Sequence, residues 1–136
     1  MRASLIVLAL LLAGCAEQGA AGPADAPSGP PNRAQAWSHC QDPNRGLAAA
    51  NACTALIEAG QETRQGRISA HYNRAMALSR RGRTEAAMAD YDAALQLDPS
   101  FALALYQRGL LFQSLGQQIR ADQDLMRASQ LDSRLR

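Results

Sequence analysis

The sequence predicts an all-α fold, a short solenoid of helical hairpins, from two observations. First, residues 68–101 and 102–135 align without a gap at an offset of 34 residues, with ten identities. Second, each segment reads as two helical stretches separated by a glycine, and Pro99 follows the second stretch of the first segment. A hairpin repeated at a fixed period buries its apolar side on its neighbours, which gives a solenoid. The identical positions are Ala70/Ala104, Tyr72/Tyr106, Arg74/Arg108, Gly82/Gly116, Ala87/Ala121, Asp90/Asp124, Ala94/Ala128, Gln96/Gln130, Leu97/Leu131 and Asp98/Asp132.

The residues within each hairpin agree with this prediction. Small residues fall where two antiparallel helices must approach, and larger apolar residues form wedges between the helices. In the first hairpin the small residues are Ala75, Ala87 and Ala94, and the larger ones are Leu78 and Tyr91. In the second hairpin the corresponding residues are Gly109, Phe112, Ala121, Leu125 and Ala128.

The period and the pattern Y-N-R-G/A … G-R … A … D-Y … A … L-D-P closely resemble the tetratricopeptide repeat (TPR) family. Two positions depart from the family: Ser133 stands where the consensus has proline, and Leu125 replaces the usual aromatic residue. The resemblance implies two full repeats, residues 68–101 and 102–136. We expect a degenerate N-terminal helical unit, residues 36–67, before them.

In the TPR family the first helix of each repeat lines a concave groove that binds peptide segments, so the resemblance implies such a groove here. Spacings of i, i+3, i+4 and i+7 put each set of groove positions on one helix face. The implied groove residues are Tyr72, Asn73, Met76, Arg80, Leu103, Tyr106, Gln107 and Leu110. Leu103 and Leu110 would otherwise meet water, which favours a partner or self-association. The alternative is ordinary helix surface, with tyrosines that only stack between units.

The N-terminal unit is less regular than the two repeats. Its segment DPNRGLAAANACTALIEAG reads as a helix with Asp42 as N-cap, Pro43 in the first turn and Gly60 after the end. This helix has a broad apolar side and could be the second helix of the unit. Its first helix would then be short or missing, with the segment around Trp37 in its place.

Cys40 and Cys53 have three interpretations. An exported location is oxidising and favours a disulfide, and resemblance to small alphaproteobacterial TPR proteins with a W-x-x-C … A-C-T-x-x-I segment also implies one. The bridge closes only if the regular helix begins later than Pro43, near Gly46, because a helix from Pro43 carries Cys53 roughly 15 Å along its axis. The alternatives are free thiols, or a metal site in which His39 and His71 join the two cysteines, although such a site lacks the close ligand pairs of structural zinc sites.

The N-terminus predicts export and lipidation. Arg2 precedes an apolar stretch, Leu5 to Ala13, that is typical of a signal peptide over residues 1–14. The L-A-G-C sequence that follows resembles the lipobox of bacterial lipoproteins, which implies fatty acylation of Cys15 after cleavage. In that family, Ala16 indicates transfer to the outer membrane. Residues 15–35 are rich in Ala, Gly and Pro, so we expect a flexible tether.

Composition and motifs argue against several function classes. The chain of 136 residues has a formal net charge of +2, which is too balanced for a nucleic-acid binder. The sequence has no Gly-rich phosphate loop and no nucleophile elbow. We therefore expect neither an enzyme nor a protein with a cofactor or bound metal.

Two arginine–aspartate pairs recur with the repeat. Asp90 follows Arg74 by sixteen residues, and Asp124 follows Arg108 by the same spacing. In a helical hairpin such positions can face each other, so we expect two structural ion pairs.

Together these features predict a lipid-anchored protein of the cell envelope, an outer-membrane lipoprotein that faces the periplasm. The expected function is a protein–protein interaction scaffold or assembly factor. Its partner would be an envelope protein or peptide segment, and only the lipid would contact the membrane. The alternative is a self-associating structural lipoprotein without a dedicated peptide groove.

Overall fold

The computed structural model describes residues 32–136. The expected signal peptide (residues 1–14), the lipidated Cys15 and most of the expected tether (residues 15–35) lie outside the described residues.

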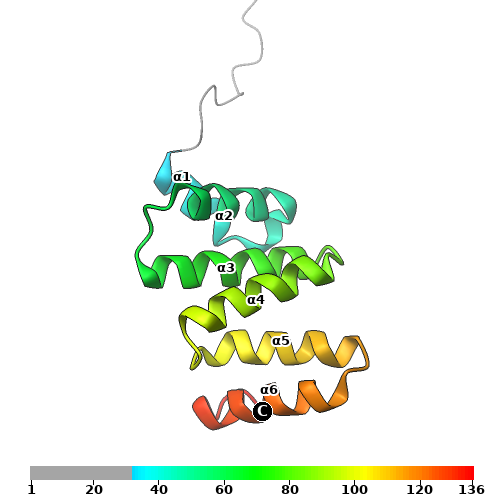
Figure 1. Cartoon of the computed structure of the whole chain (residues 1–136). Helices are drawn as coiled ribbons and strands as arrows, with labels where there is room; N and C mark the ends of the chain where they lie inside the picture. The colour runs from blue at the N-terminus through cyan, green and yellow to red at the C-terminus, as the bar shows by residue number, and fades with distance from the viewer. Residues whose placement is uncertain (1–31) are drawn as a thin grey trace, which may run out of the picture.

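The described residues form three consecutive helical hairpins stacked along one direction (Figure 1). The helices are α1 (Arg33–Cys40), α2 (Leu47–Ala59), α3 (Arg64–Ser79), α4 (Thr84–Leu97), α5 (Ala102–Ser114) and α6 (Gln118–Leu131), with a short 3-10 helix η1 (Pro43–Arg45) before α2. The pairs α1–α2, α3–α4 and α5–α6 pack as antiparallel hairpins. The predicted all-α solenoid of helical hairpins is confirmed.

Two helices begin earlier than the sequence predicts. The expected end of the tether, Gln35, lies inside α1, because the Asn32 side chain accepts a hydrogen bond from the Gln35 amide and caps the helix. The expected start of the first full repeat, residue 68, lies inside α3, whose N-cap Thr63 accepts from the Gly66 amide. Both boundaries are therefore set by polar caps rather than by the first apolar residue.

The helix α2 begins later than a helix with Asp42 as its N-cap would. Asp42 accepts from the Asn44 amide and caps η1 instead, so that reading of the segment is wrong for the regular helix. Gly46 then separates the two elements with a φ of 56° and a ψ of −121°. Residues with a side chain rarely adopt this backbone conformation. Gly60 ends α2 as expected, in the left-handed conformation.

The core is built largely from alanine, which allows the helices to approach closely. Ala75, Ala87 and Ala94 are fully buried, and Tyr91 is the largest fully buried side chain. In the last hairpin Gly109 permits an even closer approach, because a Cβ atom there would lie 2.9 Å from Cγ of Leu125. The predicted pattern of small residues and wedges therefore describes the packing between helices.

The stack has two long sides. The first helices of the hairpins contact one another, α1 with α3 and α3 with α5, and we call their side the first-helix face. The side formed by α2, α4 and α6 is the second-helix face.

Among residues 32–136, no helix combines the length and hydropathy needed to cross a bilayer.

Candidate functional site

A disulfide joins Cys40, the last residue of α1, to Cys53 in the middle of α2. Their Cα atoms lie 4.8 Å apart, and both cysteines are buried. The late start of α2 after Gly46 satisfies the geometric condition for this bridge. The free-thiol and metal-ligand alternatives do not describe this arrangement, because each sulfur is bonded to the other.

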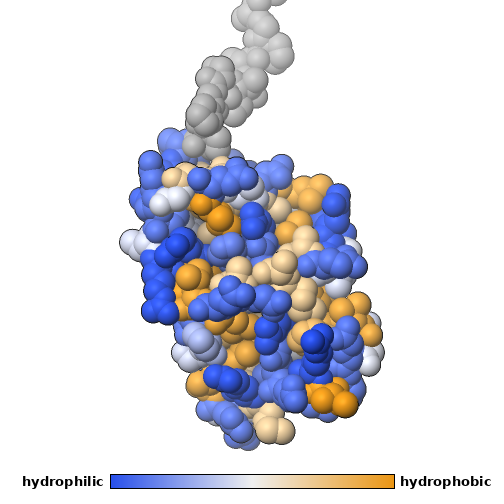
Figure 2. Space-filling model, in the orientation of Figure 1, coloured by the Kyte–Doolittle hydropathy of each residue, from blue (hydrophilic) through white to orange (hydrophobic). Residues whose placement is uncertain are grey.

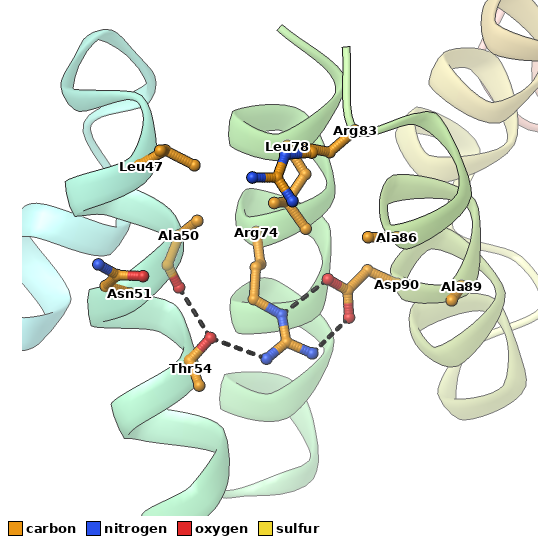
Figure 3. Close-up of a pocket in the computed structure, with 10 residues that line it drawn as sticks. All are labelled: Leu47, Ala50, Asn51, Thr54, Arg74, Leu78, Arg83, Ala86, Ala89 and Asp90. Carbon is orange, nitrogen blue, oxygen red and sulfur yellow. Dashed lines mark hydrogen bonds and ion pairs between the residues drawn. The ribbon is translucent and has the colours of Figure 1, made fainter. Parts of the chain in front are cut away.

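The arginine–aspartate pair of the first repeat lies at the centre of a polar network (Figure 3). Nε and Nη2 of Arg74 each donate to one oxygen of Asp90, both over 2.7 Å. Nη1 of Arg74 donates to Oγ1 of Thr54 on α2 over 3.0 Å, and Nδ1 of His71 donates to Asp90 over 2.9 Å. The network therefore connects α2, α3 and α4 across two hairpins.

The second repeat contains the matching network. Arg108 donates to both oxygens of Asp124, over 2.7 and 2.9 Å, and its Nη1 donates to Asp92 on α4 over 2.6 Å. Asp90 and Asp124 are the only buried charged residues among those described. Both expected ion pairs are thus present, and they lie in the interior rather than on the surface.

Burial and hydrogen bonding oppose each other at Asp90. Burial alone would raise the pKa of the Asp90 carboxyl, but the hydrogen bonds from His71 and Arg74 outweigh it, and the pKa lies below its usual value. The hydrogen bond to Asp90 also raises the pKa of Arg74. Both groups are therefore charged at neutral pH, as a bidentate ion pair requires.

The predicted groove residues divide between packing and surface. The centre of the Tyr72 ring lies 5.0 Å from the centre of the Phe101 ring and 6.2 Å from that of the Tyr91 ring. Met76 packs against the same core. These two side chains mainly join the middle and last hairpins. Leu103 and Leu110 remain 42% and 37% exposed. The other members of the set are half-buried, except for the exposed Arg80: they are Asn73, Tyr106 and Gln107.

Tyr106 and Leu110 line a hollow of about 440 Å³ at the end of the stack. The residues of α6 and the C-terminus that complete this hollow were not predicted as site residues from the sequence: they are Leu125, Met126, Ser129, Leu135 and Arg136. The repeat register could have identified them. Leu135 follows Phe101 by 34 residues, and Phe101, the N-cap of α5, contacts Tyr72, which is the counterpart of Tyr106 in the preceding hairpin. The hollow is therefore the place where the first helix of a further hairpin would pack.

Comparison with known families agrees with this geometry. Residues 76–116 match a family model described as TPR repeat, and residues 102–134 match one described as tetratricopeptide repeat. Residues 76–134 are TPR repeats. No curated protein and no solved structure gives a significant match.

The TPR repeats suggest a protein–protein interaction scaffold and imply a protein partner. The family matches cover the end of α3 and all of α4, α5 and α6. The TPR hairpins therefore include Leu103, Tyr106 and Leu110, the part of the predicted groove that stays accessible.

Within residues 32–136, no group of three His, Cys, Asp or Glu side chains is placed to hold a metal ion.

Proposed function

We propose that the protein is a lipid-anchored TPR scaffold of the bacterial cell envelope, held in the outer membrane and facing the periplasm. Support for the anchor comes from the sequence, where Cys15 follows an apolar leader in a lipobox-like context. The disulfide between Cys40 and Cys53 supports an exported location, because disulfides persist in oxidising compartments.

We propose further that the partner binds around Leu110, at the end of the first-helix face. The observation that carries this proposal is the hollow of about 440 Å³ that Tyr106 and Leu110 line. Tyr106 offers an apolar ring with a hydroxyl group, and Leu103 lies exposed on the same helix. An apolar helix or extended segment of the partner would cover these side chains and exclude water from them.

Affinity capture from solubilised envelopes tests the proposal. The full-length chain should retain one envelope protein, and Leu103→Ser/Leu110→Ser should reduce its recovery at least tenfold. Tyr72 is left intact because its ring supports the packing between hairpins. Gln96→Ser, at an exposed position of α4, is the matched control and should capture as the wild type does. Equal capture by the double variant would contradict the proposed face.

The anchor is tested in the same cells. Cys15→Ser should move the protein out of the membrane fraction, whereas the wild type stays with the outer membrane. A Cys15→Ser protein that fractionates like the wild type would contradict lipid anchoring.

Self-association through the end of the stack is the second candidate function. Ile119 and Met126 on α6 are 78% and 61% exposed, and apolar patches lie among polar side chains over the α5–α6 end (Figure 2). Exposed apolar surface of this kind favours association between copies. Capture of the chain only by itself, together with a sedimentation coefficient that rises with concentration, would favour this candidate over a separate partner.

A further inference from the structure

The second-helix face carries two clefts related by the 34-residue repeat. The first cleft lies between α2 and α4 over α3 and has a volume of about 520 Å³, whereas the second, between α4 and α6 over α5, has about 270 Å³. The corresponding lining residues are Thr54/Met88, Arg74/Arg108, Leu78/Phe112, Ala86/Arg120, Ala89/Gln123 and Asp90/Asp124. The fold thus provides the same cleft twice, with different side chains.

The second cleft is narrower and electrically balanced. The guanidinium of Arg120 lies over the Phe112 ring, 5.2 Å from its centre, and occupies space in the cleft. Arg108 is held between two carboxylates, those of Asp92 and Asp124. Two arginines therefore face two carboxylates, which leaves no net charge for a ligand.

The first cleft is open and carries excess positive charge (Figure 3). Ala86 and Ala89 stand where the second cleft has Arg120 and Gln123, so both side chains end at Cβ. Its lining includes Arg74 and Arg83 against a single carboxylate, that of Asp90.

A free acidic group does lie near the first cleft. Glu58 occupies the register position of Asp92 and raises the pKa of Arg74 through its charge, after the larger effect of Asp90. Glu58 is exposed, however, and forms no ion pair with a described residue, whereas Asp92 directly contacts Arg108. Arg74 therefore has only one bonded carboxylate.

The loop between α3 and α4 adds to the positive charge at this cleft. Arg81 and Arg83 are exposed, and neither forms an ion pair with a residue of the described part of the chain. The Arg81 guanidinium lies against Gly46, beside the start of α2. Glu85 is the one acidic residue in the first turn of α4. This arrangement attracts an anionic partner towards the cleft.

We propose that the first cleft is a second docking site, separate from the first-helix face, and that it binds an acidic segment of a partner protein. A carboxylate side chain of that segment pairs with Arg83 and the outer edge of Arg74, and a neighbouring apolar side chain packs on Leu78, Ala86 and Ala89. Arginine pairs well with the planar carboxylate. A phosphate dianion fits less well, because its second charge would lie near Asp90 in the same lining.

Fluorescence anisotropy of the full-length chain in detergent tests this proposal. The probe is a labelled peptide of alternating glutamate and leucine, and the same peptide with glutamine for glutamate is its control. The wild type should bind the glutamate peptide at least tenfold more tightly than the glutamine peptide. Absence of that preference would overturn the proposal.

The repeat supplies the decisive variant. Ala86→Arg/Ala89→Gln installs the side chains that the second cleft already carries, so it narrows the first cleft towards the volume of the second while adding a positive charge. We expect at least a tenfold loss of peptide binding, because the remaining space is too small for the apolar side chain of the segment. Unchanged or tighter binding would show general charge attraction and overturn the proposal.

Two further variants separate this site from folding defects and from the proposed function. Arg83→Gln changes an exposed side chain and should weaken peptide binding at least fivefold, whereas Arg120→Gln in the second cleft should leave it unchanged. Leu103→Ser/Leu110→Ser, which removes the proposed partner contact, should also leave peptide binding unchanged. Displacement of the peptide by an equal concentration of inorganic phosphate, or binding to anionic lipid vesicles without binding to the peptide, would overturn the acidic-segment assignment.

Discussion

Asp90→Asn should lower the free energy of unfolding by roughly 3 kcal/mol, because it leaves the Arg74 guanidinium half-buried without its bonded counter-charge. The asparagine keeps one acceptor oxygen, for which Arg74 and His71 would compete, and its NH2 group would face donors. Urea unfolding followed by circular dichroism measures the change. Loss of less than about 1 kcal/mol would contradict a stabilising role for this network.

Asp92→Asn is the matched control for this prediction. The Asp92 side chain is 48% exposed, and Arg108 keeps its two hydrogen bonds to Asp124 without it. We expect a loss of less than about 1 kcal/mol, as for other exposed ion pairs.

Acid should reduce the difference between wild type and Asp90→Asn. The pKa of Asp90 is lower in the folded than in the unfolded chain, where it is about 3.9, so its ionised form stabilises the fold above that pH. This stabilisation is lost as the pH falls through the folded-state pKa. The free energies of unfolding of the two proteins should therefore converge as the pH falls from 6 to below 3.

Removal of the disulfide should have the second large effect. Cys40→Ala/Cys53→Ala opens a loop with a sequence separation of 13 residues, which corresponds to about 3 kcal/mol of unfolding free energy in the loop-entropy model. The effect should be largest in α1, because this short helix is otherwise attached by a small apolar cluster and by the pair of the exposed Arg33 with Glu62. Hydrogen exchange should show faster exchange in α1 than in α3 to α6. Unchanged exchange in α1, or an unchanged free energy of unfolding, would contradict this role.

The sequence predicts the helices of the two repeats well because packing and period act together there. Ala75, Ala87 and Ala94 fall where two helices must approach closely, so their small size predicts contacts between helices. All three are fully buried in the structure. The sixteen-residue spacing of Arg74 and Asp90 likewise predicts their pairing, since it spans one hairpin turn. These features depend on local spacing, which a sequence displays directly.

Other features depend on contacts that no local pattern encodes. The caps Asn32 and Thr63 lie in polar stretches without periodicity, so they give little indication of where α1 and α3 begin. Tyr72 is predicted as a groove residue, yet Phe101 from the next hairpin packs against it. Whether a repeat position faces solvent depends on what the neighbouring repeat places over it.

The volume of the first cleft could not be predicted from the sequence for a third reason. Its lining follows the repeat, but its volume depends on a difference between repeats, where Ala86 and Ala89 replace Arg120 and Gln123. Identities between repeats predict the shared fold. Differences between repeats decide which surfaces remain available for binding, and they acquire meaning only when the packing is known.

Site-specific photocrosslinking at Leu110 in intact cells tests the central claim, that the end of the first-helix face contacts a protein partner. A photoreactive benzoylphenylalanine at position 110 should give one adduct with an envelope protein, and the same residue at position 96, an exposed position of α4 that lines neither cleft, should not. An adduct with the mass of two copies of the chain would instead indicate self-association. No adduct at position 110, in a protein that remains folded, would contradict the claim.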